Sequence, residues 1–565
     1  MGLTGPGASA VPQCTLDQFE QNFRDRHLLQ GAVSNWAAQK PHAPAILNHD
    51  RRETLSWGAL DSLTTALAAR LLRLGFRKGE FLAASLPFLT GHILLEYACF
   101  KIGVIHVPLD LRLRPAEVLR ALSMTSPRAF ACLGKTPAAD FRDLAQAVRA
   151  QCPSVEHLIQ FSPPEETIPG AISFSDLLDH SPRVPDSEYE RAASSVGEND
   201  PAQAIFTTGS TGSPKAALLS HRNITCQNMC LGAAFGFGPS TRLLVNLPPS
   251  HVGGQAEALM TTLFWGGTAI VLEVFDPARS LDAIEQHGVN VLGQIPAMYN
   301  YQWRLPDFGA RRLDSLAFAI YGGQQAPLSF LARLAKMAPG IGTGLGLTEA
   351  AGFCTYTPRD ASVDAVAASI GHAMPVYPMT IRKPMKEDGF AGEPLPDGEI
   401  GHVCFQGPQT FLGYAGDPEA TANAVSRDGI LYTGDLGARY QDGLRFAARA
   451  KWVIKPAGHQ VFPADVENHF CLLDKVAACA VVGVEHPLLS EAIVAFVEKR
   501  PGVDISVSEL RQHARGIASY MRPLHYILLE AGQLPFNRAA KYDYLRLREM
   551  ARQAAVRLGW MSDLR

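Results

Sequence analysis

Short apolar, β-branched runs alternate with helical patterns between about residues 30 and 350. The strand-like runs include Arg242–Asn246, Thr268–Leu272, Val289–Gln294 and Leu316–Ile320, and the helical runs include Glu257–Trp265, Ser280–His287, Ala297–Trp303 and Leu328–Met337. This alternation predicts α/β layers with largely parallel sheets. Such folds bind ligands where the carboxyl ends of strands meet. We therefore expect the chemistry of this chain in loops that follow strands.

The pattern changes after about Pro375. Short alternating segments such as Glu399–Gln406 and Leu444–Ala447 predict a small β subdomain over residues 380–450. From Trp452 onward the pattern is mixed, with helices expected at Val466–Leu473 and Val507–Ala518 and strands at Ala477–Val484 and Ala492–Glu498. The predicted architecture is α/β: a large N-terminal domain of layered α/β subdomains plus the small β subdomain (1–449), then a small mobile α+β C-terminal domain (450–565). A hinge is expected near Ala448–Lys451.

Composition and charge exclude several classes of protein. The chain has 565 residues, 47% hydrophobic and 19% charged, and a net charge of −3, so no basic field indicates nucleic acid or an anionic membrane. Its ten cysteines lack the short paired spacings of a disulfide scaffold. No secretory signal is visible, and a cytoplasmic location is predicted.

The most apolar stretch, Phe81–Leu111, does not predict a membrane span. His92, Glu96 and Lys101 interrupt it, and no run of about eighteen uncharged apolar residues remains. We expect a strand, a buried helix and a second strand here.

The strongest chemical signal is Thr207-Thr208-Gly209-Ser210-Thr211-Gly212-Ser213-Pro214-Lys215, which follows the apolar run Ala204–Phe206. Gly209 and Gly212 permit backbone conformations that point successive N–H groups at one anion, and the hydroxyls and Lys215 add donors and charge. The segment predicts a polyphosphate-binding loop. A flexible surface loop is the alternative, and the spacing differs from a Walker A loop.

Other motifs follow in a fixed order. They are Gly344-Leu345-Gly346-Leu347-Thr348-Glu349, Tyr432-Thr433-Gly434-Asp435, Arg449-Ala450-Lys451 with Ile454-Lys455, Gly458, Pro463 and Glu467, and Leu534-Pro535 with Lys541. Together with the Gly-rich loop, this set resembles the AMP-forming adenylating enzymes, a superfamily that includes acyl-CoA synthetases. The chain departs from that pattern at Ala448, Trp452, Met521 and Ala540.

The resemblance implies a role for each motif. Glu349 and Thr208 would hold Mg²⁺, Thr208 and Thr348 would donate to phosphate, Asp435 would accept the ribose hydroxyls, and Lys541 would bridge carboxylate and α-phosphate. The implied catalytic residues are Lys541, Glu349, Thr208 and His251. The implied ATP/AMP-binding residues are Thr207, Thr208, Gly209, Ser210, Thr211, Gly212, Lys215, Gly323, Gln324, Gly344, Leu345, Gly346, Leu347, Thr348, Asp435, Arg449 and Lys541.

The resemblance also implies a pocket for the carboxylic acid and a region that receives CoA. The acid pocket would involve Val252, Gly253, Gln255, Tyr321, Gly322, Gly352 and Phe353. Lys451 would be the hinge, and His251, Lys455 and Gly458 would lie on the CoA side. No Arg or Lys is expected in the pocket to bind a second carboxylate, so a medium-sized apolar monocarboxylate, branched, alicyclic or aromatic, is the predicted acid.

The resulting prediction is an ATP-dependent carboxylic acid:CoA ligase with Mg²⁺, ATP and CoA, acting as a monomer or homodimer. A stand-alone enzyme that loads an acyl-carrier protein is the main alternative. A lipase-like hydrolase is excluded because no Gly-x-Ser-x-Gly elbow accompanies His251. His221, Cys226 and Cys230 fit the packed face of a helix capped by Ser220 better than a zinc site.

Overall fold

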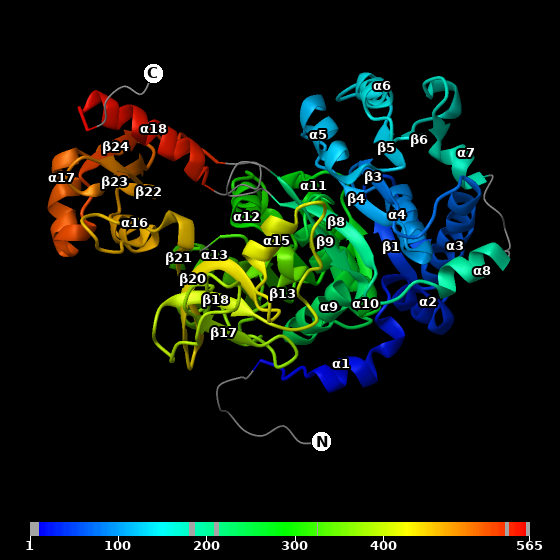
Figure 1. Ribbon diagram of the computed structural model, residues 1–565, viewed down its shortest axis with the longest axis horizontal. Helices are drawn as coiled ribbons and strands as arrows, with labels where there is room; N and C mark the ends of the chain where they lie inside the picture. The colour runs from blue at the N-terminus through cyan, green and yellow to red at the C-terminus, as the bar shows by residue number, and fades with distance from the viewer. Residues whose placement is uncertain (1–10, 180–186, 208–213, 325, 537–541, 561–565) are drawn as a thin grey trace. The chain divides into compact units, whose positions relative to one another are not determined.

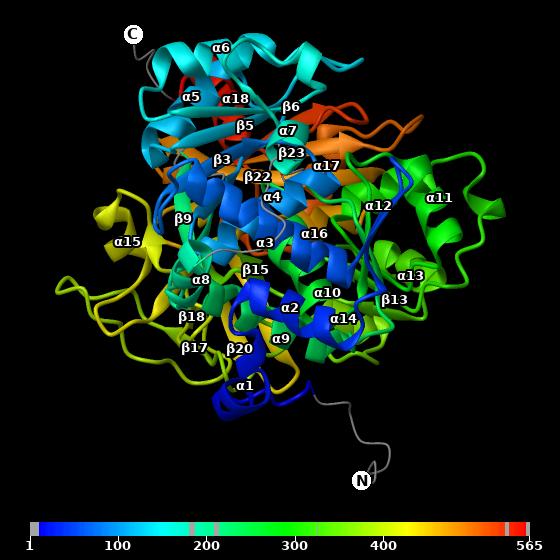
Figure 2. The same ribbon diagram turned by 90° about the vertical axis from the view of Figure 1, so that its right-hand side faces the viewer.

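The computed structural model describes residues 11–179, 187–207, 214–324, 326–536 and 542–560. The chain divides into two compact units: unit 1 is Met1–Met379 with Phe405–Leu431, and unit 2 is Thr380–Cys404 with Tyr432–Arg565. Figures 1 and 2 label the helices and strands of both units. Residues 380–404 and 432–450 of the predicted small β subdomain thus belong to unit 2 with the predicted C-terminal domain, whereas residues 405–431 belong to unit 1. A boundary at residues 449 and 450 remains a prediction about which part moves.

One sheet of unit 1 has eight strands in the order β19-β9-β8-β4-β3-β5-β6-β7. Its strands are β3 (Phe81–Ser85), β4 (Ile105–Pro108), β5 (Ala129–Leu133), β6 (His157–Phe161), β7 (Ile172–Ser173), β8 (Pro201–Thr207), β9 (Lys215–Ser220) and β19 (Gly413–Tyr414). Strands β3 to β8 pair in parallel, as predicted. Strand β9 runs antiparallel to β8, and β19 antiparallel to β9. The Gly-rich segment therefore connects two antiparallel neighbours.

The second large sheet of unit 1 has the order β14-β13-β12-β10-β11-β1-β2 and is parallel apart from β2. Its strands are β1 (Pro44–Asn48), β2 (Glu53–Ser56), β10 (Arg242–Val245), β11 (Thr268–Val271), β12 (Val291–Gln294), β13 (Phe318–Tyr321) and β14 (Gly340–Gly342). The four strands predicted between residues 242 and 320 are confirmed, with ends shifted by up to two residues.

Helices surround these sheets, and Figure 2 shows α13 beside β13. The helices of unit 1 are α1 (Leu16–Asn22), α2 (Leu29–Gln39), α3 (Trp57–Arg73), α4 (Thr90–Ile102), α5 (Pro115–Thr125), α6 (Arg142–Gln151), α7 (Phe174–Asp179), α8 (Ser187–Ser194), α9 (His221–Phe235), α10 (Thr261–Phe264), α11 (Pro277–His287), α12 (Pro296–Trp303), α13 (Leu328–Met337), α14 (Val363–Ala368) and α15 (Pro418–Ala424). The single helix predicted at Glu257–Trp265 is instead a π-helix, Gly253–Met260, followed by the short α10.

The apolar stretch Phe81–Leu111 forms β3, α4 and β4, as predicted. Helix α4 is buried on nearly every side. Its Glu96 accepts a hydrogen bond from Gln203 on β8 over 2.6 Å and lies 3.0 Å from His106 Nδ1 on β4, which satisfies a buried carboxylate. No helix within the described residues is both long enough and apolar enough to cross a bilayer.

Unit 2 holds two smaller sheets. The first has the order β17-β18-β20-β21 and the second β22-β23-β24. Their elements are β17 (Met379–Arg382), β18 (Gly401–Phe405), β20 (Leu431–Tyr440), β21 (Gly443–Arg449), α16 (Pro463–Cys471), β22 (Val476–His486), β23 (Ser490–Lys499), α17 (Val507–His513), β24 (His525–Leu529) and α18 (Tyr544–Arg557). The helix predicted over Val507–Ala518 ends at His513, where a 3₁₀ turn replaces it.

Candidate active site

The ends of the Gly-rich loop are held together by the β8–β9 ladder. Thr207, the last residue of β8, is the cross-strand partner of Lys215, the first residue of β9. The predicted phosphate-binding residues between them, Thr208, Gly209, Ser210, Thr211 and Gly212, lie outside the described residues. The Lys215 ammonium lies 5.1 Å from the ring centre of Tyr414, which makes a cation–π contact next to the loop.

The same tyrosine reaches the predicted metal ligand. The Tyr414 hydroxyl donates to Glu349 Oε1 over 2.5 Å, and the Phe411 N–H donates to the Glu349 backbone carbonyl over 2.9 Å. Burial, and then the nearby Glu349 carboxylate, raise the pKa of Tyr414 well above its ordinary value, so its proton stays in this bond. Lys215, Tyr414 and Glu349 thus form one connected cationic, aromatic and anionic group in unit 1.

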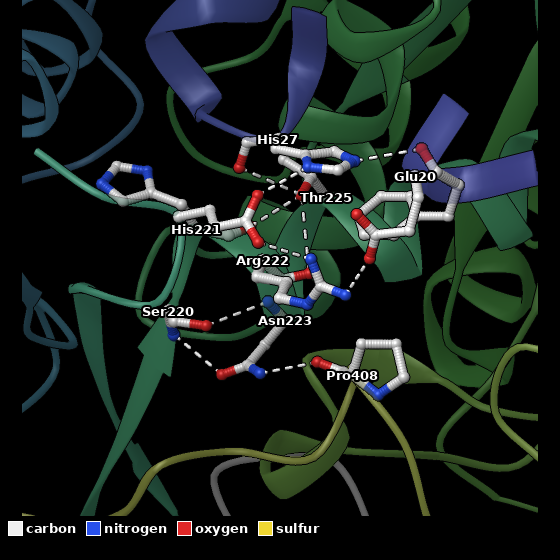
Figure 3. Close-up of polar contacts among 10 residues, drawn as sticks. Glu20, His27, Ser220, His221, Arg222, Asn223, Thr225 and Pro408 are labelled. Carbon is white, nitrogen blue, oxygen red and sulfur yellow. Dashed lines mark hydrogen bonds and ion pairs between the residues drawn. The ribbon is translucent and has the colours of Figure 1, made fainter. Parts of the chain in front are cut away.

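The start of α9 anchors the strand that carries Tyr414 (Figure 3). Ser220 caps the helix by accepting from the Asn223 N–H, and Asn223 Oδ1 accepts from the Ser220 N–H in return. This is the predicted cap, completed as a reciprocal pair. The Asn223 amide also donates to the carbonyls of Pro408 and Thr410, each over 2.7 Å, which positions the segment leading into β19.

One cluster near the start of α9 contains side chains of the kinds that bind metal ions, but an arginine already pairs with its carboxylates. Glu20, His27 and Glu198 place one potential ligand atom each within 4.8 Å of one another. Arg222 pairs with both carboxylates, and His27 Nδ1 lies 2.6 Å from Glu198 Oε2. Because the guanidinium already neutralises the carboxylates, the cluster is an ion-pair network that ties the N-terminal segment to α9.

The predicted nucleotide motif folds into a small hairpin. Strand β15 (Gly346–Leu347) pairs antiparallel with β16 (Gly352–Phe353), and a 3₁₀ turn, Thr348–Ala350, places Glu349 at the tip. The Leu345 N–H donates to Thr355 Oγ1 over 2.8 Å. A Cβ on Gly344 would lie 1.9 Å from the Thr355 carbonyl oxygen, so only glycine fits there.

Residues predicted for the acid pocket and for nucleotide binding meet around the ring of Phe353. A Cβ added to Gly322 would lie 3.1 Å from this ring, and one added to Gly346 would lie 2.7 Å from it. Gly344 approaches the same ring, at 3.5 Å. The glycines therefore form a bare backbone surface with Phe353 packed against it, and we refer to Gly322, Gly344, Gly346 and Gly352 as the glycine surface.

The His251 segment borders the π-helix. The Gly253 N–H donates to His251 Nδ1 over 3.0 Å, and a Cβ on Gly253 would lie 3.4 Å from Glu257 Oε2. His251 is exposed, whereas Val252, Gly253 and Gln255 are buried. Neither amide atom of Gln255 has a hydrogen-bond partner among the described residues.

The end of β13 and the loop after it contain the remaining predicted site residues of unit 1. Tyr321 is buried and its carbonyl accepts from Thr343 Oγ1 over 2.9 Å. Gly323, with a φ of +88°, and Gln324 are exposed at the carboxyl end of the strand, where a ligand of a parallel sheet is expected.

Unit 2 pairs the predicted ribose acceptor with the predicted arginine. Asp435 and Arg449 face each other across β20 and β21, with Arg449 Nε 2.9 Å from Asp435 Oδ1. Arg449 also donates to the Thr433 carbonyl over 3.1 Å. The Asp435 side chain is almost entirely buried and the Arg449 side chain is 42% exposed, so the pair presents its cation outward.

The predicted hinge and CoA-side residues follow this pair. Lys451 lies in a 3₁₀ turn, and burial, followed by repulsion from Arg449 and Arg548, lowers its pKa to about 8. The Lys455 N–H donates to Glu491 over 2.6 Å, and Gly458 has a φ of +84°. Lys541 lies outside the described residues.

Sequence reasoning missed two residues, Tyr414 and Glu257. The Gly413-Tyr414 pair carried a weak signal, an aromatic in a short polar segment, but its contact with Glu349 needs the antiparallel pairing of β19 with β9. Glu257 stands in a run read as helical, and its approach to the glycines needs the π-helical backbone.

Comparison with known proteins identifies the class. Residues 33–415 match the AMP-binding enzyme family and residues 465–541 match the AMP-binding enzyme C-terminal domain. The chain therefore belongs to the AMP-binding enzyme family, the adenylate-forming class that its ordered motifs predicted.

Particular relatives and structures are similar over most of the chain. A feruloyl-CoA synthase of Amycolatopsis sp is 31% identical over 86% of this chain and 92% of its own. A Mycobacterium tuberculosis ligase, named for a methyl-dioxo-octahydroindenyl propanoyl:CoA, is 30% identical over 94% and 100%. The fold matches ATP-bound MatB from Rhodopseudomonas palustris with a TM-score of 0.81, at 24% identity and over 94% and 99% of the two chains.

The residues of unit 1 fit the magnesium ion that the family implies. Mg²⁺ takes oxygen ligands and is commonly held by one or two carboxylates together with substrate phosphates. Glu349 offers such a carboxylate, half-buried at the tip of its hairpin and oriented by Tyr414.

Proposed function

We propose that the protein is an ATP-dependent carboxylic acid:CoA ligase, which forms an acyl-adenylate and pyrophosphate and then an acyl-CoA thioester and AMP. The observation that carries the proposal is that two relatives at least 30% identical, over 86% or more of the chain, are both named for CoA thioester formation. The adenylate-forming class of the fold accounts for the first half-reaction.

The first half-reaction is an electrostatic problem, because a carboxylate must attack the α-phosphorus of a polyanion. In the proposal, Lys215 and the Gly-rich loop bind the phosphates, and Tyr414 holds the Glu349 carboxylate in one orientation. Asp435 accepts the ribose hydroxyls while Arg449 limits its negative charge. Lys541 brings the two reacting anions together, as the resemblance implies, and preorganised charge of this kind lowers the barrier.

Glu349 and Thr208 would hold Mg²⁺, which when bound neutralises phosphate charge and supplies Lewis acidity. The protein's own contribution is the orientation of the carboxylate. A ligand already held by a hydrogen bond binds a metal better than one free to rotate, which is the role proposed for Tyr414.

For the acid we propose a medium-sized monocarboxylate with a branched, alicyclic or aromatic body. The names of the two relatives describe a feruloyl group and a bicyclic propanoyl group, both compatible with this size. For the second half-reaction we propose that residues 450–565 rotate about Lys451 to admit CoA. A cytoplasmic location and a monomeric or homodimeric state remain predictions from the sequence.

The test is a panel of carboxylic acids assayed for ATP-dependent pyrophosphate release, with and without CoA, and for thioester formation. Saturation by CoA at sub-millimolar concentration, with much slower reaction of pantetheine, supports the proposal. Reaction with a holo acyl-carrier protein at micromolar concentration, with pantetheine as good as CoA, would replace it by a carrier-loading enzyme.

A further inference from the structure

Glu257 contacts the glycine surface from the π-helix. A Cβ placed on Gly352 would lie 2.7 Å from Glu257 Oε1, and one on Gly346 would lie 3.3 Å from the same oxygen. Gly352 has a φ of +130°, a conformation that suits glycine, so a side chain there is excluded on two grounds. The half-buried carboxylate therefore lies against bare backbone beside Phe353. π-Helical segments are rare and occur often at functional sites.

A buried donor lies near the same position of Gly352. Gln227 on α9 is fully buried, and its Nε2 would lie 3.1 Å from the Gly352 Cβ position. This amide nitrogen has no hydrogen-bond partner among the described residues, whereas its Oε1 accepts from Asn228 Nδ2 over 2.9 Å. A buried donor left unpaired costs free energy, and at a binding site a ligand commonly supplies the acceptor.

An acceptor and a donor near one glycine fit a ligand group that can both donate and accept a hydrogen bond. A hydroxyl can donate to the Glu257 carboxylate and accept from the Gln227 amide. A carboxylate has two oxygens and about four acceptor positions, so it can take this bond in addition to one from the protein. An ammonium group could serve Glu257 but offers nothing to Gln227, and a second carboxylate would be repelled by Glu257.

We propose that Glu257, with Gln227, determines the specificity of the acid site by selecting a carboxylic acid that carries a hydroxyl group away from its carboxyl group. The inference rests on the proposed function, and it refines the predicted apolar acid to a hydroxylated one. Sites built to bind a substrate hydroxyl reject the analogue that lacks it, because their own polar groups are then left unpaired.

The experiment uses the full chain and matched acids. The probes are phenylpropanoate and cyclohexylpropanoate, each compared with its ring-hydroxylated and ring-carboxylated analogues, in pyrophosphate release with ATP and in thioester formation with CoA. Aminocyclohexylpropanoate, whose ring amine is an ammonium group at neutral pH, tests a cationic substituent. We expect hydroxylated acids to exceed their parents in kcat/KM by about ten- to a hundredfold, and the other analogues to gain nothing. Glu257→Gln, with nearly the same shape, should reduce that preference to below threefold, and Glu190→Gln on the exposed face of α8 should leave it unchanged.

The outcomes separate the inference from the proposed function. Activation of the parent acids with no preference for a hydroxyl overturns the inference and leaves the ligase intact. An equal preference in wild type and Glu257→Gln, or a greater preference for an amino group, also overturns it. Failure of every acid to release pyrophosphate overturns the proposed function and the inference together. Because the wild-type comparison needs no variant, it decides the matter even if Glu257→Gln does not fold.

Discussion

Trp452 stacks on Tyr544, with ring centroids 5.4 Å apart and ring planes 27° apart. Lys451, the predicted hinge, lies with its ammonium 4.4 Å from the centre of the same tryptophan ring. The Tyr544 hydroxyl donates to Glu467 Oε1 over 2.9 Å. The residue after the predicted hinge is thus tied through α18 to α16. An aromatic at this position, a departure from the family pattern, gives Lys451 a packed neighbour.

Replacing Lys451 with proline tests the hinge. Proline restricts φ to about −65°, so a backbone that must rotate at this residue is locked. We expect Lys451→Pro to retain pyrophosphate release with acid and ATP while thioester formation from CoA falls at least tenfold. Lys451→Ala is the control, since it removes the ammonium but keeps the rotation. Normal rates for both half-reactions in the proline variant would mean that Lys451 is not the pivot.

Replacing the predicted catalytic lysine, Lys541, should affect the opposite half-reaction from the proline variant of Lys451. Its charge is needed only while a carboxylate meets a phosphate, so Lys541→Ala should slow adenylate formation by about two to three decades. Thioester formation from supplied acyl-AMP should change much less. Lys336→Ala, at an exposed position of α13, serves as the control. Equal losses in the two half-reactions would contradict the role.

The contact between Tyr414 and Glu349 predicts a change in metal dependence. Tyr414→Phe removes the hydroxyl that orients the carboxylate, and such losses typically weaken metal binding by about 10- to 100-fold. The Mg²⁺ concentration for half-maximal pyrophosphate release should rise accordingly, with a smaller change at saturating Mg²⁺. Tyr301→Phe, 53% exposed on α12, should leave the titration unchanged. An unaltered titration in Tyr414→Phe would show that the bond does not support the metal site.

Glu467 predicts a pH dependence of stability in unit 2. Burial raises its pKa to about 7 from an ordinary 4.5, against the effect of its bonds from the Val481 N–H and the Tyr544 hydroxyl. The folded state therefore binds more protons than the unfolded state between these values, so stability falls as pH rises from about 4.5 to about 7. The thermal midpoint of wild type should fall over that window relative to Glu467→Gln. Parallel pH profiles for the two proteins would contradict the raised pKa.

The close approach of Gly344 to the Thr355 carbonyl predicts that no larger residue can replace this glycine. A side chain at Gly344 would come within 1.9 Å of a backbone carbonyl, which cannot move without displacing the hairpin that carries Glu349. Overpacking typically costs about 1–3 kcal/mol, so Gly344→Ala should lower the thermal midpoint and abolish most adenylation. Gly309→Ala, where a Cβ meets nothing within 4 Å, should have neither effect. Normal activity in Gly344→Ala would refute the close approach.

The parts of the fold that depend on local pattern were predictable. Helix α13 has the bounds expected for it, because Leu331, Leu334 and Met337 repeat at helical spacing along its buried face. The reciprocal cap between Ser220 and Asn223 is equally local. The family motifs assigned roles to Glu349, Asp435 and Arg449 because each stands in a short, ordered segment, and these roles remain predictions.

The parts that depend on pairing between distant segments were not predictable. Strands β9 and β19 pair antiparallel although they lie about 200 residues apart in the sequence. Without that pairing, nothing in the sequence indicates that Tyr414 contacts Glu349.

The π-helix was not predictable for a different reason. Its hydrogen bonds span one more residue than those of an α-helix, as in the bond from the Glu257 N–H to the Val252 carbonyl, and a pattern of apolar residues does not distinguish the two.

The glycine surface has a consequence for how this enzyme could diverge. In the proposed acid site this backbone offers no side chains, so the side chains that lie against it, Phe353, Glu257 and Gln227, project from β16, the π-helix and α9. Lys215, Tyr414 and Asp435, assigned here to phosphate, metal and ribose, stand on other strands. Substrate choice can therefore be rewritten at a few positions while the adenylation chemistry is inherited intact, which makes the scaffold easy to retarget by mutation or by laboratory evolution.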